Sequence, residues 1–318
     1  MSNYTSTCPW PLFDEQERDD IVDQLHYIGG FSSLIFIGLL LAYIHSTFET
    51  NRSYQNIGFF MLSAWIRRGT PFLMAYIIDK KEIYRREMTL CRLFGFFETF
   101  MAIHEVECLT HVCIERYVVG KYVTNGWRIP DRHYYMFRLL SVLFAGTYSL
   151  AAVSGLIGGY GHDFTCSTCT MDMILPGGWQ KYFVSLLFIM RSIKPVGFMI
   201  VMLRWAKQLE SKFVDVAYNR IQRKITDEVI ALTAVNLTCW APIALIQASV
   251  VLSQHLYGPG EFSLPSPSLV KMALVLHWSS LGCSTINLFL LNPNIRKAAF
   301  NFRFRHFSEL TSDPHKTE

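Results

Sequence analysis

Seven apolar stretches follow one another along this chain of 318 residues, and short polar segments separate them. Each stretch has about 20 residues or more, the length that a helix needs to cross roughly 30 Å of hydrocarbon. A soluble all-α protein is the alternative, but it would leave nearly every helix apolar on all sides. The pattern therefore predicts an all-α fold, a seven-transmembrane helix bundle. The predicted spans cover residues 26–46, 56–78, 91–114, 137–159, 181–203, 229–253 and 268–291.

Composition and charge agree with a bundle in lipid. Hydrophobic residues make up 51% of the chain and charged residues 17%. Lys and Arg are concentrated after the first, third and fifth spans and in the C-terminal tail, which predicts an N-terminus outside and a C-terminus inside. No basic patch is interleaved with aromatic residues, so nucleic acid is not an expected partner. We expect an extracellular segment at 1–25, a bundle at 26–306 with a short amphipathic helix after the last span, and a cytoplasmic tail at 307–318.

The cysteines divide by the predicted side of the membrane. Four fall on the oxidising outer side, where disulfides persist, and allow two bridges: Cys8, Cys91, Cys166 and Cys169. The other four fall within spans as small apolar residues: Cys108, Cys113, Cys239 and Cys283. No His/Cys spacing resembles a zinc site, so no metal is expected. The outer segment also contains a glycosylation sequon at Asn3.

A polar triplet, Glu115-Arg116-Tyr117, lies at the inner end of the third span. It places an arginine between a carboxylate that can hold it and an aromatic ring that can shield it. A binding partner could break such an ion pair. Alone, the triplet is more typical of a solvated helix surface, but its place at the end of an apolar span favours a switch.

The triplet is one of several patterns that occur in a fixed order. The others are Cys91 on the same span, Pro195 in the fifth span, Cys239-Trp240-Ala241-Pro242 in the sixth, and Asn292-Pro293 at the end of the seventh. Together they resemble the rhodopsin-like (class A) G-protein-coupled receptors over almost the whole chain. The resemblance implies a multi-pass receptor in the plasma membrane with a heterotrimeric G protein as its partner. It assigns the inner switch to Glu115, Arg116, Tyr117, Asn292 and Pro293.

Within that class, the loop after the fourth span resembles the second outer loop of opsins. It contains Gly159-Tyr160-Gly161-His162 and then Thr168-Cys169-Thr170-Met171-Asp172. The resemblance implies that Cys169 pairs with Cys91 and ties this loop over the ligand pocket. Cys8 with Cys166 is a second candidate pair.

Opsins hold retinal on a lysine of the seventh span, seven residues before the proline of the Asn-Pro motif. That position is Ile286, and the chain has no lysine between Lys271 and Lys297. We therefore expect no covalent retinal and no other cofactor. A chain that has the opsin-like loop and helix motifs but lacks this lysine resembles the nematode opsin-like chemoreceptors of the SRO family. That resemblance implies a non-covalent small-molecule ligand and, within the plasma membrane, the ciliary membrane of sensory neurons.

Charged residues also lie inside the spans, where each one is costly. A charge at the middle of a membrane helix costs about 2.5–3.5 kcal/mol on insertion scales, so it is expected to face the bundle interior, pair, or line water. Glu105 has two candidate partners in Arg67 and Arg68, and Glu107 is expected to face a hydrogen-bonding neighbour. The intramembrane charges are Arg67, Arg68, Glu98, Glu105, Glu107, Arg191 and Lys194.

Two of these charges are candidates for the ligand pocket. Helical spacing places Glu98 and Glu105 on one stripe of the third span, and Arg191 and Lys194 on one stripe of the fifth. The resemblance places Glu98 in the pocket and Arg191 on the side that faces it. Either they bracket a polar or zwitterionic ligand, or they hold each other until one arrives. The structural alternative is that such charges only pair and specify packing.

The resemblance also makes Trp240 an aromatic toggle below the pocket, with a core aromatic as the alternative. Lys194 could form a Schiff base from the fifth span, but a lysine beside Pro195 can simply bond carbonyls that the proline frees. His104, His111 and His277 are expected to be interior histidines. The predicted ligand residues are Glu98, Arg191, Trp240, Lys194 and Ile286.

Several functions compete on this basis. The leading one is a chemosensory G-protein-coupled receptor. The alternatives are an opsin-like retinoid-binding photoreceptor, a retinoid isomerase, and a transporter or channel. The missing lysine argues against the retinoid functions, and no Ser/His/Asp, Cys/His or metal arrangement predicts an enzyme. The sequence shows no inverted repeat, which argues against a transporter.

Overall fold

The computed structural model describes most of the chain. It covers residues 13–44, 46, 51–77, 88–153, 159–162, 169–171, 180–213, 217–258 and 266–300. The predictions for Asn3, for the pairing of Cys8 with Cys166 and for the tail at 307–318 lie outside the described residues.

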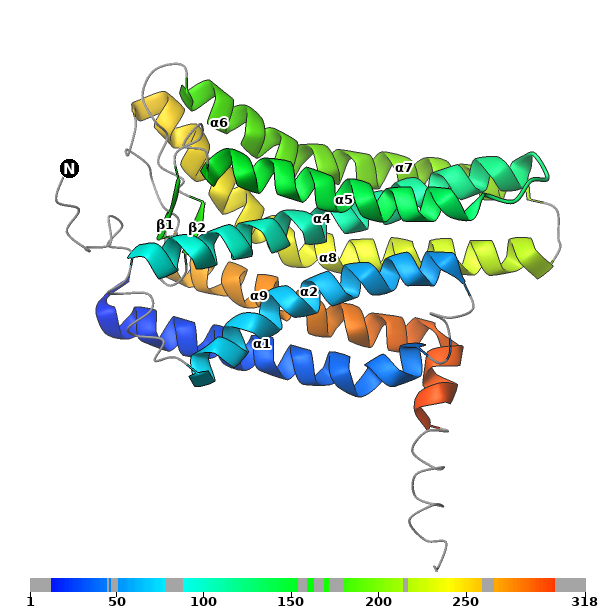
Figure 1. The fold of residues 1–318 in the computed structure, drawn as a ribbon, viewed down its shortest axis with the longest axis horizontal. Coiled ribbons are helices and arrows are strands. Elements are labelled where there is room, and N and C mark those ends of the chain that lie inside the picture. Colours follow the sequence, from blue (N-terminus) through cyan, green and yellow to red (C-terminus); the bar gives the residue numbers. More distant parts are fainter. Residues whose placement is uncertain are drawn as a thin grey trace, which may run out of the picture.

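The described chain forms a seven-helix bundle, which confirms the predicted all-α class (Figure 1). The fifth span consists of three segments, α6, η2 and α7, which follow one another without a break. The helices are α1 (Glu15–Tyr43), α2 (Arg52–Ile77), α4 (Met88–Thr124), α5 (Asp131–Val153), α6 (Gln180–Phe188), η2 (Ile189–Ile193), α7 (Lys194–Glu210), α8 (Ala217–Tyr257) and α9 (Pro267–Leu291). Residues 293–300 form a further helical segment, which turns away from α9 in Figure 1.

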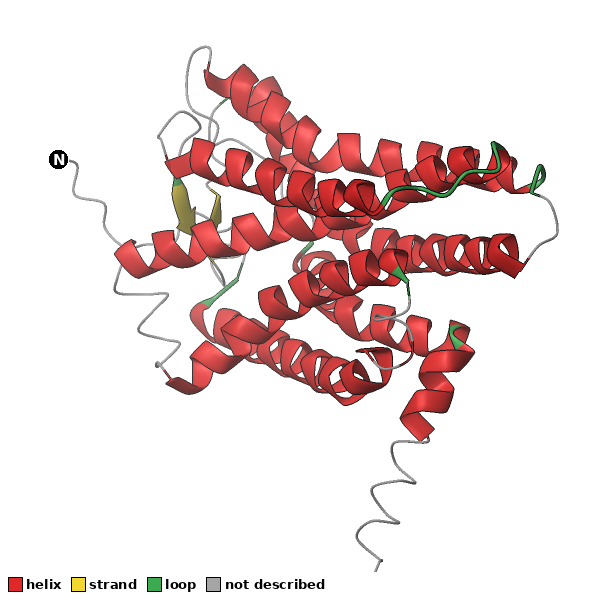
Figure 2. Cartoon of the chain, turned by 45° about the vertical axis from the view of Figure 1, so that its right-hand side comes forward, coloured by secondary structure: helices red, strands yellow, loops and turns green. Residues whose placement is uncertain are grey.

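A short antiparallel hairpin lies at one end of the bundle. Its strands are β1 (Tyr160–His162) and β2 (Cys169–Met171), and Tyr160 pairs with Met171. The start of α1 lies at the same end, whereas the turn between α4 and α5 lies at the opposite end (Figures 1 and 2). The outer loop and the Glu115-Arg116 pair are thus separated by the length of the bundle.

Five described helical segments are long and apolar enough to cross a membrane, judged by length and composition. They are Gln16–Tyr43, Asp131–Val153, Val184–Glu210, Ala217–Tyr257 and Pro267–Leu291. The other two spans of the bundle are α2 and α4, which carry buried charges. Because of these charges, the composition of α2 and α4 is closer to that of helices in soluble proteins. Both helices nevertheless belong to the same bundle.

Local signals set the helix ends. α1 begins before the predicted span, because Asp14 and Glu17 form a capping box: the Asp14 carboxylate accepts from Glu17 N at 2.7 Å, and Asp14 N donates to Glu17 at 3.3 Å. α4 ends at a glycine cap. Gly126 has φ of +73°, and Trp127 N donates back to Tyr122 O at 2.9 Å. The chain therefore turns sharply after the inner end of α4.

Candidate functional site

A cavity of about 150 Å³ lies inside the bundle beside the β1–β2 hairpin. Residues of α2, α4, η2, α7, α8 and α9 form its walls, together with Thr170 of β2. Three of the predicted ligand residues, Glu98, Arg191 and Trp240, line it. An interior cavity where several helices meet is the usual kind of place for a small-molecule site in a bundle.

The hairpin is fixed against α4 next to this cavity. The disulfide implied by the resemblance is present and joins Cys91 to Cys169. A Cβ atom at Gly95 would come within 3.1 Å of the Tyr160 side chain, so glycine allows the close approach of hairpin and helix. Burial raises the pKa of Tyr160 to about 12, and its hydroxyl donates to Ser149 O at 2.8 Å. The hairpin is thereby tied to both α4 and α5.

A π-helical turn directs Arg191 into the cavity. The fifth span changes to π-helix over Ile189–Ile193, just before Pro195, and such wider turns often occur at functional sites. Arg191 Nη2 donates to Gln247 Oε1 of α8 at 3.3 Å. Two neighbouring helices of the cavity are thus linked by a polar contact.

Lys194 does not line this cavity, and its role as a ligand residue stays a prediction. Its ammonium group pairs with the Glu107 carboxylate at 2.8 Å and lies 4.7 Å from the ring centre of Phe144. Glu107 therefore has a charged partner, where only a hydrogen-bonding neighbour was expected. The π-helical turn separates the directions of Arg191 and Lys194, which a regular helix would place on one stripe.

The remaining intramembrane charges form one chain of ion pairs. Arg67 lies 2.6 Å from Glu98 and 3.1 Å from Glu105, and Arg68 lies 2.9 Å from Glu105. The prediction that Glu98 and Arg191 hold each other is wrong, because the partner of Glu98 is Arg67. Both candidate partners of Glu105 bind it.

Arg68 is held through both terminal nitrogens of its guanidinium, Nη1 and Nη2. It is 2% exposed, and it also donates to Ala64 O at 3.2 Å, to His277 O at 3.3 Å and to the Ser280 hydroxyl. A buried guanidinium needs acceptors for its N–H groups in addition to a carboxylate, because it has lost its hydration. The cluster thus joins α2, α4 and α9 behind the cavity.

At the inner end, Arg116 joins three helices. It is buried, it pairs with Glu115, and it donates to the Ser53 hydroxyl of α2 and to Gln222 Oε1 of α8 at 3.1 Å. Glu115 also accepts from the Asn56 amide. This network holds the inner ends of α4 and α8 together.

Tyr117 does not shield this pair. Its ring packs against Trp205 of α7 at a centroid distance of 5.5 Å, and the Lys121 ammonium lies 5.6 Å from its centre. The expected shielding is wrong because successive residues of a helix point about 100° apart. Tyr117 instead connects α4 with α7.

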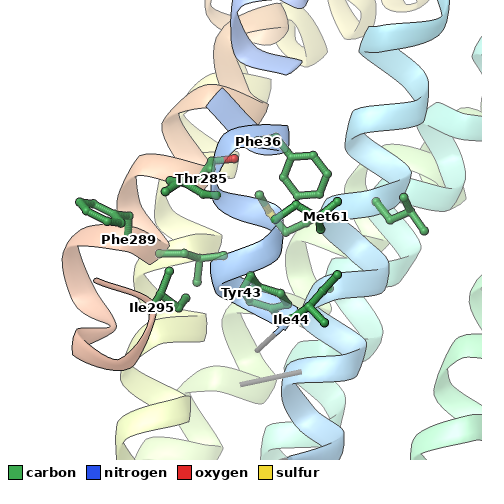
Figure 3. Close-up of a pocket in the computed structure, with 12 residues that line it drawn as sticks. Phe36, Tyr43, Ile44, Met61, Thr285, Phe289 and Ile295 are labelled. Carbon is green, nitrogen blue, oxygen red and sulfur yellow. The ribbon is translucent and has the colours of Figure 1, made fainter. Parts of the chain in front are cut away.

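A second cavity, of about 240 Å³, lies between α1, α2 and α9 (Figure 3). Its lining is apolar apart from Tyr43 and Thr285, and it includes Phe36, Met61 and Phe289. It has no charged side chain among its lining residues. Polar groups that fix orientation distinguish specific ligand sites, so we place the candidate site in the first cavity.

The comparisons with known proteins agree with this architecture. No protein-family model matches the chain. The crystal structure of squid rhodopsin superimposes on it with a TM-score of 0.71 and 13% sequence identity, over 97% of this chain and 92% of that chain. The chain has a rhodopsin-like fold.

Two curated relatives are rhodopsins as well. One, a rhodopsin of Psalidodon fasciatus, is 26% identical over 192 residues, which cover 55% of this chain and 52% of the relative. The other, a Gq-coupled rhodopsin of Mizuhopecten yessoensis, is 20% identical over 312 residues, which cover 88% of this chain and 60% of the relative. The matches thus span only about half to three fifths of these relatives.

Within the rhodopsin-like fold, Ile286 does not line this cavity, and its role as a ligand residue stays a prediction. Its side chain is 45% exposed, and the cavity-lining residues of α9 are Leu274, His277 and Trp278. Asn292-Pro293 lies after the end of α9 rather than inside it. None of the three lining residues of α9 carries an amine.

Asn292 instead begins the next helical segment. Its side-chain oxygen accepts from Asn294 N at 3.0 Å and from Ile295 N at 3.4 Å, with Pro293 at the first helical position. Both features are typical of a helix start. The motif therefore sets the turn between α9 and the segment at 293–300.

The same asparagine takes part in a second inner network, which the sequence reasoning missed. The Tyr54 hydroxyl donates to Glu228 at 2.9 Å, and Asn292 Nδ2 donates to Tyr54 at 3.0 Å and to Glu228 at 3.3 Å. Lys224 lies 3.6 Å from Glu228. The available signal was a carboxylate one residue before the predicted sixth span. The network ties α8 to α2 and to the end of α9.

Proposed function

We propose that this protein is a G-protein-coupled receptor that binds a small molecule non-covalently in the cavity beside the hairpin. The observation that carries the proposal is the course of α8. This helix contributes Trp240 and Gln247 to the cavity and Gln222 to the network around Arg116. One continuous helix therefore touches both the candidate ligand site and the candidate switch.

Pro242 provides a hinge in α8 among the residues that line the cavity. It lies inside α8, where proline removes a backbone hydrogen bond and weakens the helix locally. A ligand that binds better to a second arrangement of α8 shifts the population toward that arrangement. Movement of the inner half of α8 would separate Gln222 from Arg116 and expose the guanidinium to a partner.

The partner in this proposal is a heterotrimeric G protein. The relative from Mizuhopecten yessoensis is named as Gq-coupled, which supports the class of partner. We place the receptor in the plasma membrane with its N-terminus outside. The resemblance to SRO chemoreceptors supports a chemosensory role, with the ciliary membrane of sensory neurons as the site.

Replacing Arg116 with alanine tests the proposal directly. Truncation of an arginine that anchors an interface costs about 2 kcal/mol or more, so ligand-stimulated nucleotide exchange should fall at least about tenfold. Surface expression should be reduced but not abolished, since Glu115 loses its buried partner, so exchange is measured per receptor at the surface. Lys121→Ala, on the same helix, removes a cation that has no ion pair among the described residues and should have a much smaller effect. Full exchange activity in Arg116→Ala would contradict the assigned switch.

Two substitutions of Gln222 are expected to change nucleotide exchange without ligand in opposite directions. A carboxylate in place of this amide would turn the hydrogen bond that Arg116 donates into an ion pair, which is stronger than the bond to a neutral oxygen. Gln222→Glu should lower nucleotide exchange without ligand by about fivefold to tenfold, and Gln222→Leu should raise it. Reconstitution with purified G protein measures both. Equal exchange in both variants would show that this contact does not hold the closed state.

The likeness to rhodopsins also raises a second candidate, a retinoid-binding photoreceptor. The cavity does not favour it: a cavity of about 150 Å³ holds a molecule of roughly the size of benzene, which is much smaller than a retinoid. Lys194, the one amine predicted near the pocket, is paired with Glu107 outside it. A visible absorption band after addition of retinal would support this candidate. No observation favours a retinoid isomerase, a transporter or a channel.

A further inference from the structure

Charge is not balanced at the cavity. Arg67 is neutralised by Glu98 at 2.6 Å and Glu105 at 3.1 Å. Arg191 also lines the cavity, but within the described part of the chain its one polar partner is the neutral amide of Gln247, at 3.3 Å. Among the described residues, three guanidinium groups here face two carboxylates, since Arg68 shares Glu105. Both carboxylates are bound by Arg67 and Arg68, so in this described part the guanidinium without an ion pair is that of Arg191.

Two further polar atoms of cavity-lining residues lack a partner. The indole N–H of Trp240, a residue 7% exposed, and Nδ1 of His277 are buried without a hydrogen-bond partner in the described structure. Buried polar groups are nearly always hydrogen-bonded, and an exception needs an explanation. The indole N–H has almost no accessible surface, so a ligand acceptor reaches it only when the Trp240 ring turns toward the cavity.

We propose that the ligand is a small organic acid whose carboxylate binds Arg191 and accepts a second hydrogen bond from Trp240. Its body is apolar and about the size of one benzene ring, because the cavity has a volume of about 150 Å³. Ile243, Leu274 and Trp278 provide the apolar wall. For its effect on signalling, this inference rests on the proposed receptor function.

A cationic ligand fits the same cavity poorly. Its natural partner would be Glu98, but that carboxylate already binds Arg67 at 2.6 Å. An amine would have to separate this pair and leave a guanidinium uncompensated. A carboxylate needs no such exchange at Arg191. The sequence predicted a polar or zwitterionic ligand between Glu98 and Arg191. The ion pairs narrow this to a ligand with an acidic group that binds Arg191.

Direct binding to the purified receptor tests the ligand class. Matched acids, primary amides and amines on the same bodies, such as benzoate, benzamide and benzylamine, together with the corresponding short aliphatic series, would be titrated by calorimetry and by thermal shift. We expect the best acid to bind at least about tenfold more tightly than its amide, because the acid forms an ion pair with Arg191 whereas the amide offers only a neutral acceptor. If no acid exceeds its own amide, the inference is overturned.

Variants of Arg191 locate the effect. In Arg191→Gln, the preference for acid over amide should fall from about tenfold or more to nearly one, and in Arg191→Lys part of it should remain. Arg204→Gln, an exposed arginine farther along α7, is the matched control and should keep the full preference. An unchanged acid preference in Arg191→Gln would overturn the assignment. The comparison of acid and amide on the unaltered receptor stands even if a variant folds poorly.

The same panel separates this inference from the proposed function. Binding is measured without a G protein, so an acid that binds through Arg191 without changing nucleotide exchange would leave the ligand class intact and refute the receptor function. Conversely, exchange that is stimulated by amines or amides and not by acids would support the receptor function and refute the ligand class.

Discussion

Replacing Glu105 with glutamine is expected to lower the free energy of unfolding by about 3–5 kcal/mol. Glu105 is 0% exposed, and it accepts hydrogen bonds from Arg67 Nη1 at 3.1 Å and from Arg68 Nη1 at 2.9 Å. Glutamine has the same shape but no charge, so Arg68 would keep a buried guanidinium without a carboxylate. A lower midpoint of thermal unfolding in detergent, and less receptor at the cell surface, should report the loss.

Two further variants show whether charge is the cause. Arg68→Gln combined with Glu105→Gln leaves Arg67 with Glu98 and removes the unpaired charge, so the double variant should be more stable than Glu105→Gln alone. Asp131→Asn breaks an exposed pair with Arg52 at 3.1 Å, where the loss should be about 0–1 kcal/mol. If Glu105→Gln lowers the free energy of unfolding no more than Asp131→Asn does, the buried ion pairs of Glu105 do not stabilise the fold.

The seven-helix architecture could be predicted because the length of an apolar stretch depends on the thickness of the bilayer. The partners of Glu105, Arg67 and Arg68, could be predicted as well. The partner of Glu98 could not, because sequence spacing fixes which residues share a stripe, but not how each helix is rotated or how deep it lies. Glu98 pairs with Arg67 of α2 rather than with Arg191 of the fifth span.

Two local irregularities account for the other misplaced residues. The π-helical turn at Ile189–Ile193 separates Arg191, which faces the cavity, from Lys194, which pairs with Glu107. No signal of residue type marks a single π-turn in advance. Asn292-Pro293 resembles a motif inside a span, but it forms the start of the following helical segment. Ile286, seven residues before Pro293, lies on an exposed face of α9.

Loss of the Cys91–Cys169 disulfide is expected to lower the free energy of unfolding by about as much as Glu105→Gln does. The bond closes a loop with a sequence separation of 78 residues. The chain-entropy model assigns such a cross-link about 4.5 kcal/mol, and removal of native disulfides typically costs about 2–5 kcal/mol. The double variant Cys91→Ser with Cys169→Ser avoids a leftover thiol, and thermal unfolding with and without reducing agent measures the loss.

The same variant should weaken ligand binding more than the fall in stability explains, because the disulfide fixes β2 beside the cavity that Thr170 lines. Without the bond, binding must also order the hairpin, which reduces the affinity. Cys283→Ser removes an exposed free cysteine and should change neither quantity. If the double variant binds ligand as tightly as the unaltered receptor at a temperature where both are folded, the hairpin is not part of the site. Weaker binding restricted to the double variant would instead show that this cross-link organises the outer wall of the cavity.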